Sequence, residues 1–272
     1  FAIVQVPSIM PRFLEIPCED GRAFVLLEDV IICHLAELFE LLEIEAWCPF
    51  RITRNSDLDI DEEAEDFLGA VKESIKKRKR GRPVRLELVN HCDKEIRSFL
   101  VDMLKMKSSE IYEVTGPLDL TFFSKFAGVS GFENLCFDPI RPVYPPADFW
   151  GYDDIFAAIR EKDRMVHHPY ESFSCVVDFV QAAAEDENVL AIKQTLYRVS
   201  GNSPIVAALI RAAENGKQVT VLVELQARFD EENNIIWARK LEKAGCHVIY
   251  GLAGLKTHCK ILLVVRKEED GI

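Results

Sequence analysis

Residues 188–251 read NVLAIKQTLYRVSGNSPIVAALIRAAENGKQVTVLVELQARFDEENNIIWARKLEKAGCHVIYG, and this stretch decides the fold of the second half of the chain. It contains apolar segments of strand length that are rich in β-branched residues, a composition typical of buried strands. These segments are residues 188–197, 218–225 and 246–250. A similar segment, residues 258–265, follows a short loop that contains glycine. We predict a strand over each of them.

Helices are predicted between these strands. Apolar residues recur at helical spacing over residues 170–186, 204–215 and 232–244. Ser203 and Pro204 form an N-cap followed by a first-turn proline, which marks a helix start. Strands that alternate with helices of this length imply crossover connections and a parallel or mostly parallel sheet. Continuous apolar strands favour a sheet that is covered on both faces, so we predict an α/β domain.

The first half of the chain mixes strand, loop and helix signals, which predicts an α+β domain. Apolar residues Leu68, Val71 and Ile75 predict a helix with acidic residues in its first turn and basic residues in its last turn. Residues 138–149 hold four of the twelve prolines and are interpreted as a linker. A chain of 272 residues is long enough for two domains. We therefore predict domains over 1–144 and 145–272.

The composition is that of an ordinary globular protein, and its charge argues against a nonspecific nucleic-acid binder. The formal net charge is −12 and the pI is about 5.1, whereas such binders are usually basic. The basic run 76–82 is better explained as a solvated helix end that complements the helix dipole. A polyanionic substrate remains compatible, because a small basic pocket can lie in an acidic protein.

The eight cysteines contain no Cys-x-x-Cys pair. Their spacing predicts neither a zinc site nor a disulfide framework, and it favours a reducing, cytoplasmic setting. No apolar stretch approaches the roughly 20 residues that span a membrane, so no transmembrane segment is predicted.

Basic residues follow successive predicted strands. Arg198 comes after the first strand, Arg228 after the second, and Lys256, His258 and Lys260 after the third. In an open α/β sheet, ligands bind beyond the carboxyl ends of the strands. Guanidinium groups match phosphate oxygens in a bidentate manner, and lysines add point charges. We therefore expect a phosphate-binding site at this edge of the sheet.

His258 and Lys260 are two residues apart, so on a strand they would face the same side. Imidazole is largely neutral at pH 7 and can attack phosphorus without first losing a proton. Neighbouring cations would neutralise the transferred phosphoryl group. The alternative is that the histidine caps the strand and the lysines extend to solvent. The cations at neighbouring strand ends favour the catalytic interpretation.

Other candidate residues have weaker support. His167 and His168 precede a helix and are expected to be solvated. Cys259 is expected to point to the opposite face and to be buried. The acidic run 230–232 either binds magnesium or occupies the first turn of the next helix, and the second is preferred. Glu224 could orient the imidazole of the proposed nucleophile. No P-loop motif is present.

The sequence resembles the polyphosphate kinases, the ATP-polyphosphate phosphotransferases of bacteria, over nearly its whole length. Two segments resemble the head domain of that family, RITRNSDLDIDEEAEDF and VTGPLDL. Other segments resemble its first catalytic domain, namely AIREKDRMVHHPYESF, VLAIKQTLYRV, VELQARFDEENNIIWARKLEKAGCHVIYG and GLKTHCK. The resemblance implies a mixed α+β head domain followed by a phospholipase-D-like α/β domain with a mostly parallel sheet.

The resemblance also implies roles for residues. His258 corresponds to the histidine that becomes phosphorylated, next to Lys260. Arg198 and Arg228 correspond to arginines associated with Mg²⁺ and phosphate. Because guanidinium groups do not ligate a cation, we expect them, with Lys256, to hold phosphate oxygens that Mg²⁺ bridges. ATP or ADP and inorganic polyphosphate are the implied partners, in a cytoplasmic homo-oligomer compatible with peripheral membrane association.

The family has an N-terminal helical domain and a second catalytic half that this sequence does not contain. The final Asp-Gly turn signal has no returning strand, so we expect a truncated fragment that is inactive alone. Two alternatives remain open. One is a phospholipase-D-type phosphodiesterase or phosphatidyl transferase, and the other is a fragment that binds polyphosphate without catalysis.

Overall fold

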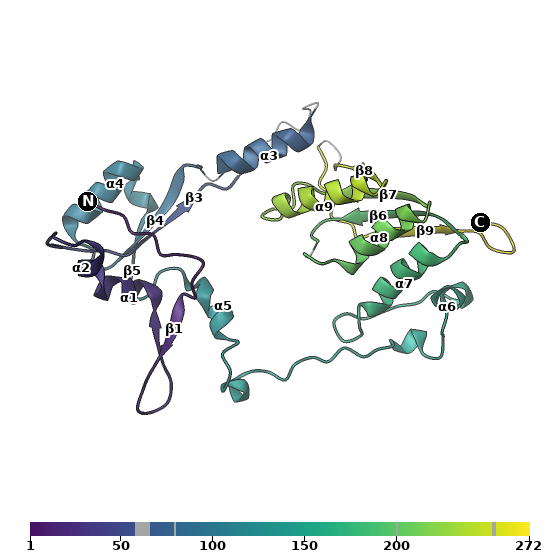
Figure 1. Cartoon of the computed structure of the whole chain (residues 1–272), viewed down its shortest axis with the longest axis horizontal. Helices are drawn as coiled ribbons and strands as arrows, with labels where there is room; N and C mark the ends of the chain where they lie inside the picture. The colour runs from purple at the N-terminus through teal and green to yellow at the C-terminus, as the bar shows by residue number, and fades with distance from the viewer. Residues whose placement is uncertain (58–65, 79, 200, 252–253) are drawn as a thin grey trace. The chain divides into compact units, whose positions relative to one another are not determined.

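The computed structural model describes residues 1–57, 66–78, 80–199, 201–251 and 254–272 (Figure 1). The described chain forms two compact units. The first contains Phe1–Asp57 and Arg78–Phe137, and the second contains Asp138–Ile272 together with most of helix α3. Helix α3 therefore groups with the second unit, although it comes from the first half of the sequence. The boundary between residues 144 and 145 stays a prediction.

The first unit is a mixture of short strands and helices. A parallel pair, β4 and β5, is connected through α4, and β3 pairs antiparallel with β4 to give the order β3-β4-β5. Strands β1 and β2 form a separate antiparallel hairpin. The elements are β1 (Phe13–Ile16), β2 (Ala23–Leu26), α1 (Leu27–Cys33), α2 (Leu35–Leu38), β3 (Phe50–Arg54), β4 (Pro83–Val89), α4 (Lys94–Leu104), β5 (Ile111–Val114) and α5 (Phe123–Phe126).

The core of this unit lies between β4 and α4. Leu86 and Leu88 of β4 pack with Leu100 of α4, and all three are almost completely buried. The carboxylate of Asp93 accepts hydrogen bonds from two backbone N–H groups in the first turn of α4, which fixes where the helix begins.

The structure corrects one prediction about the cysteines. Cys48 and Cys92 form a disulfide that joins the segment before β3 to the segment after β4. No sequence pattern predicts this pair, because the two cysteines are 44 residues apart and belong to no spacing motif. Antiparallel pairing of β3 with β4 brings these two positions together.

The second unit contains a four-stranded sheet in the order β8-β7-β6-β9. Strands β6, β7 and β8 are parallel, whereas β9 is antiparallel to β6, so the predicted mostly parallel α/β sheet is confirmed. The elements are α3 (Phe67–Arg78), α6 (Ile155–Glu161), α7 (Ser174–Glu185), β6 (Val189–Leu196), α8 (Pro204–Glu214), β7 (Gln218–Val223), α9 (Glu231–Lys243), β8 (His247–Ile249) and β9 (Leu262–Arg266).

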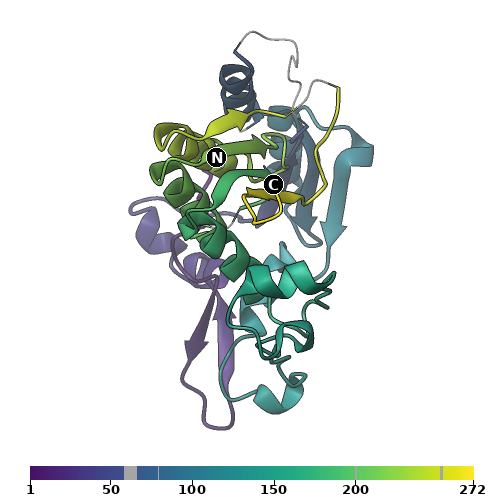
Figure 2. The same cartoon turned by 90° about the vertical axis from the view of Figure 1, so that its right-hand side faces the viewer.

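Helices α7, α8 and α9 cover one face of this sheet (Figure 2). For α8 and α9 this follows from the topology, because right-handed crossovers that advance in one direction along a sheet place their helices on the same face. Alternate residues Val219, Val221 and Val223 of β7 are buried against them. The prediction that both faces are covered is wrong for the described part of this unit. On the other face Lys193 is exposed and Leu263 retains 49% of its accessible surface.

Helix α3 contributes to the core of the second unit. Val71 and Ile75, which the sequence assigned to an apolar stripe, are 0% and 3% exposed and belong to the same hydrophobic cluster as the helices and strands of the sheet. Among the described residues, no helix is both long and apolar enough to cross a membrane.

Candidate functional site

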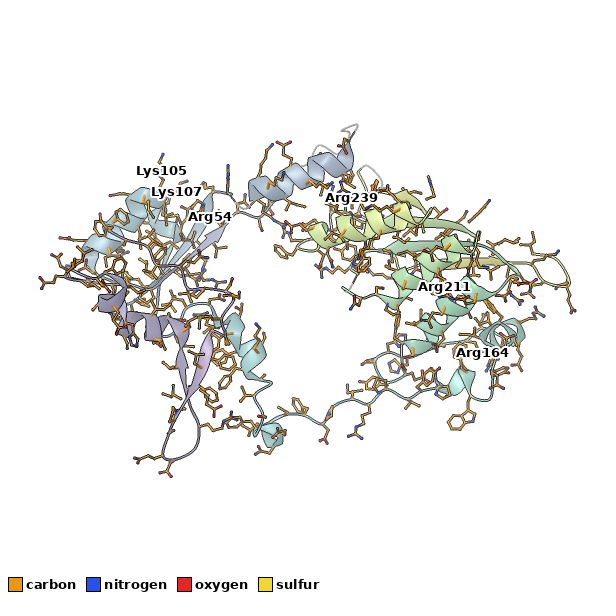
Figure 3. The ribbon with its side chains drawn as sticks, viewed as in Figure 1. Arg54, Lys105, Lys107, Arg164, Arg211 and Arg239 are labelled. Carbon is orange, nitrogen blue, oxygen red and sulfur yellow. A yellow bond between two sulfur atoms is a disulfide. The ribbon has the colours of Figure 1, made fainter. Side chains whose placement is uncertain are left out.

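The sheet brings the predicted site residues to one edge. Because β6 and β7 are parallel and β9 is antiparallel to β6, the carboxyl ends of β6 and β7 and the amino end of β9 meet there. Arg198 follows β6, Arg228 follows β7, and residues 256–260 precede β9. In contrast, other basic side chains lie on the helices, such as Arg211 on α8 and Arg239 on α9 (Figure 3).

His258 and Lys260 lie in the loop before β9, not on the strand itself. The strand begins at Leu262, four residues later than the apolar run predicts. Strand alternation therefore does not determine where these side chains point. Cys259 is exposed, which corrects the expectation that it is buried. In a loop without strand pairing, the alternation argument used for Cys259 does not apply.

Two side chains hold this loop to the sheet. The carboxylate of Glu224, which directly follows β7, accepts a hydrogen bond from the backbone N–H of Thr257 at 2.7 Å. The hydroxyl of Thr195 in β6 donates to the carbonyl oxygen of Cys259 at 2.7 Å and accepts from the N–H of Ile261 at 2.9 Å. The backbone is thus fixed immediately before and after His258.

Glu224 is almost completely buried, with 3% of its surface exposed. Its other carboxylate oxygen accepts from the backbone N–H of Gln226 at 2.9 Å. Both oxygens are therefore satisfied by main-chain donors, as a buried carboxylate requires. We expected Glu224 to orient the imidazole ring of His258. Its carboxylate instead bonds the backbone of Thr257, the residue before that histidine.

Tyr197, which follows β6, is the centre of the site. The centroid of its ring is 4.8 Å from that of His258, with the two rings edge to face. The Nζ atoms of Lys260 and Lys256 are 4.8 and 5.9 Å from the tyrosine centroid, and the guanidinium carbon of Arg198 is 5.6 Å away. The structure thus brings four of the five predicted site residues around one ring.

Sequence reasoning did not identify this tyrosine. The available signal was its position directly before Arg198, at the end of a buried strand. Its carbonyl oxygen accepts a hydrogen bond from the side-chain amide of Asn234 in α9, and the same amide donates to the carbonyl of Glu224 at 2.9 Å. Asn234 is completely buried, and its amide links Tyr197, which follows β6, to Glu224, which follows β7.

The side chain of Arg198 contacts the main chain of Arg228. Nη2 of Arg198 donates to the carbonyl oxygen of Arg228 at 3.1 Å, and Nε of Arg198 forms an ion pair with Asp230 at 2.8 Å. The guanidinium carbon of Arg228 is 5.9 Å from the ring centroid of Phe229. Phe229 has a φ of +72°, a left-handed conformation that is rare for a bulky residue and that often occurs at functional sites.

The remaining candidates have other environments. Nδ1 of His168 is 2.9 Å from the carbonyl oxygen of Glu171, within the segment that precedes α7. Glu231 and Glu232 form the first turn of α9, in agreement with the preferred interpretation of the acidic run. Within the described residues, no group of three His, Cys, Asp or Glu side chains could hold a metal ion.

The arrangement offers an imidazole, two ammonium groups and a guanidinium at the surface of one sheet edge. Such a set of donors binds the oxygens of phosphate groups, and the imidazole provides a nucleophile within the same group.

Comparisons with known proteins agree with this chemistry. The model of the polyphosphate kinase middle domain matches residues 1–126, and that of the polyphosphate kinase C-terminal domain 1 matches residues 154–272. The polyphosphate kinase of Halalkalibacterium halodurans is 55% identical over 276 residues, which cover 100% of this chain and 39% of that protein. The polyphosphate kinase of Bacillus cereus is 52% identical over 275 residues, with coverages of 99% and 39%.

A solved structure has a similar fold. The crystal structure of polyphosphate kinase from Porphyromonas gingivalis superposes with a TM-score of 0.73 at 26% sequence identity, covering 95% of this chain and 36% of that one. The chain spans about 39% of the length of the curated relatives it matches.

Proposed function

The chain belongs to the polyphosphate kinase family, and from this premise we propose that its strand-end site takes part in reversible phosphoryl transfer between ATP and inorganic polyphosphate. His258 is the residue that becomes phosphorylated in this proposal. The activity belongs to the whole enzyme, of which this chain is a part. A cytoplasmic homo-oligomer remains our expectation for that enzyme.

The reaction has two balanced steps. A ring nitrogen of His258 attacks the terminal phosphorus of ATP, the bond to the bridging oxygen breaks, and ADP leaves with that electron pair. A terminal oxygen of polyphosphate then attacks the phosphohistidine, so that the imidazole leaves and the chain grows by one phosphate. Because donor and acceptor are both phosphoanhydrides, the sequence of steps is reversible.

The cations stabilise the transferred group. Lys256, Lys260 and Arg198 lie around the same tyrosine ring as His258, and this grouping is the observation that carries the proposal. Phosphoryl transfer depends mainly on positioning and on neutralising negative charge, which these side chains supply. Arg228 follows the neighbouring strand β7, and its main-chain carbonyl accepts a hydrogen bond from Arg198. We include its guanidinium in the proposal as a further phosphate-binding group.

Mg²⁺ would reach this site bound to the phosphate oxygens of the nucleotide. Guanidinium groups have no lone pair to donate, so Arg198 and Arg228 do not fit as metal ligands. The carboxylate of Asp230 already pairs with Arg198. In the proposal, therefore, the arginines hold the phosphates and the ion accompanies the nucleotide, where it would supply charge neutralisation.

The test uses the whole enzyme and ATP labelled at the γ-phosphate. We expect acid-labile label on His258, and its loss in the His258→Ala variant. His247→Ala is the matched control, because His247 is an exposed histidine at the start of β8, and it should retain the label. Label retained by His258→Ala contradicts the proposal.

Two other results would point to the alternatives. Cleavage of a phosphodiester without ATP would indicate phospholipase-D-type chemistry. Polyphosphate binding by the whole enzyme, without labelling or turnover, would indicate a binding protein.

A further inference from the structure

Positively charged side chains surround the ring of Tyr197. Three cationic groups, on Lys256, Lys260 and Arg198, lie within 6 Å of its ring centroid. Cations gathered around one ring repel one another, and the ion pair of Arg198 with Asp230 compensates only one of the three charges. The face of an aromatic ring carries partial negative charge and attracts each of them.

The backbone that carries the ring is held in place. Tyr197 directly follows the last residue of β6, is half-buried, and has its carbonyl bonded by the buried amide of Asn234. The groups around it depend on flexible side chains or on a loop. The ammonium group of Lys260 has one further anchor, because it donates to the carbonyl oxygen of His258 at 2.6 Å.

We propose that Tyr197 is a positioning residue, whose ring holds the imidazole of His258 and the three neighbouring cations in one group before a phosphate chain binds. This inference rests on the proposed function of the site, because it assigns the group to phosphate recognition. Preorganised charges lose less conformational freedom when the ligand arrives, so the ring raises affinity without touching the ligand. The aromatic face is the required feature, and the hydroxyl is dispensable.

Two substitutions separate the ring from the hydroxyl. Tyr197→Phe keeps the ring, and Tyr197→Leu keeps apolar bulk without the charged face. The probe is inorganic tripolyphosphate, and its binding to the chain is measured by calorimetry at low ionic strength. We expect Tyr197→Phe to bind within twofold of the unsubstituted chain and Tyr197→Leu to bind about five- to tenfold more weakly.

A matched control uses another tyrosine that contacts a cation. The guanidinium carbon of Arg164 lies 4.6 Å from the ring centroid of Tyr152, in the segment around α6 (Figure 3). Tyr152→Leu removes the same kind of contact from a different place and should leave tripolyphosphate binding unchanged. Equal losses in the two leucine variants would contradict the proposal.

A spectroscopic signature reports the placement of the imidazole directly. The edge-to-face contact at 4.8 Å should shift the carbon-bound protons of His258 through the ring current of Tyr197. We expect the shift to persist in Tyr197→Phe and to disappear in Tyr197→Leu, with the His258→Gln spectrum supplying the assignment. An unchanged shift in Tyr197→Leu would overturn the proposal.

A shape-conserving series covers the case in which the leucine variant does not fold. Phenylalanines with increasing ring fluorination at position 197 keep the bulk and remove the negative face stepwise. Tripolyphosphate affinity should fall with each step, and a flat series would refute the role of the ring. None of these readouts requires phosphorylation of His258, so they can succeed even if the proposed reaction fails.

Discussion

The carboxylate of Glu224 accepts a hydrogen bond from the backbone N–H of Thr257 at 2.7 Å, one residue before the proposed nucleophile. Glu224 and Thr257 are 33 residues apart in sequence. Their hydrogen bond therefore attaches the loop containing His258 to the residue that follows β7. The candidate site thus depends on a buried charge that does not itself reach the ligand.

Substituting Glu224→Gln should destabilise the second unit. A glutamine amide has one acceptor oxygen, so it cannot accept from both backbone N–H groups, and loss of the bond to Thr257 leaves a buried donor. An unpaired buried donor costs about 1–3 kcal/mol in the free energy of unfolding, which urea denaturation measures. Glu187→Gln is the control because Glu187 is exposed, and it should change the free energy little. Equal effects of the two substitutions would exclude the anchoring role.

Thr195→Val should loosen the other side of the same loop. The substitution keeps the shape and removes the hydroxyl that bonds both Cys259 and Ile261. We expect a loss of about 1 kcal/mol and faster hydrogen exchange at the amide of Ile261. Thr195→Ser retains the hydroxyl and should largely restore protection. Slow exchange at Ile261 in the valine variant would show that the hydroxyl does not hold the loop.

Asp230→Asn should strengthen the binding of tripolyphosphate. The carboxylate pairs with Nε of Arg198 and adds negative charge beside the proposed anion site. Both side chains are partly exposed, and exposed pairs contribute about 0.2–1 kcal/mol, so an increase of roughly threefold in affinity is expected. Calorimetry at low ionic strength measures it. Glu185→Gln, which releases Arg211 on α8 (Figure 3), is the control and should have no effect.

The free energy of unfolding should fall between pH 9 and pH 11 because of Cys246. Burial raises the pKa of this thiol from 9.0 to about 11. Above pH 9 the unfolded chain loses the thiol proton while the folded chain keeps it, so rising pH favours unfolding. The loss is on the order of 2 kcal/mol across this window.

The measurement compares denaturation of the unsubstituted chain with that of Cys246→Ala at several pH values. Lysines and tyrosines titrate in both proteins and cancel in the difference. The alanine variant should be less stable at pH 8 and should show the smaller decline up to pH 11. Parallel curves would mean that the buried thiol does not contribute.

The sequence predicted the second unit well because its signals are local. Caps such as Ser203 and apolar strand runs determine elements without reference to distant residues, and α8 begins at Pro204 as expected. The convergence of cations followed from topology, since β6 and β7 are parallel neighbours. These inferences need only periodicity, element order and the handedness of crossovers.

Other features depend on contacts that periodicity does not encode. The start of β9 at Leu262 is set by the hydrogen bonds of Thr195, which divert the preceding residues into a loop. The only sequence signal for Tyr197 is its position before Arg198 at the end of a strand, because His258, Lys256 and Lys260 come from positions about 60 residues away. Glu224 was expected at the imidazole ring and instead bonds the backbone of Thr257.

Helix α3 is expected to stabilise the second unit and not the first. Ile75 is 3% exposed and packs in the hydrophobic cluster of the second unit, although the strands on either side of α3 in sequence, β3 and β4, belong to the first. Ile75→Ala removes buried methyl and methylene groups and leaves a cavity, so it should cost about 2–5 kcal/mol. Hydrogen exchange resolves the units, and faster exchange is expected at the amides of β6 and β7, with little change in β4. Lys76→Ala is the matched control on the exposed side of the same helix. Faster exchange confined to β4 would show that α3 stabilises the first unit instead.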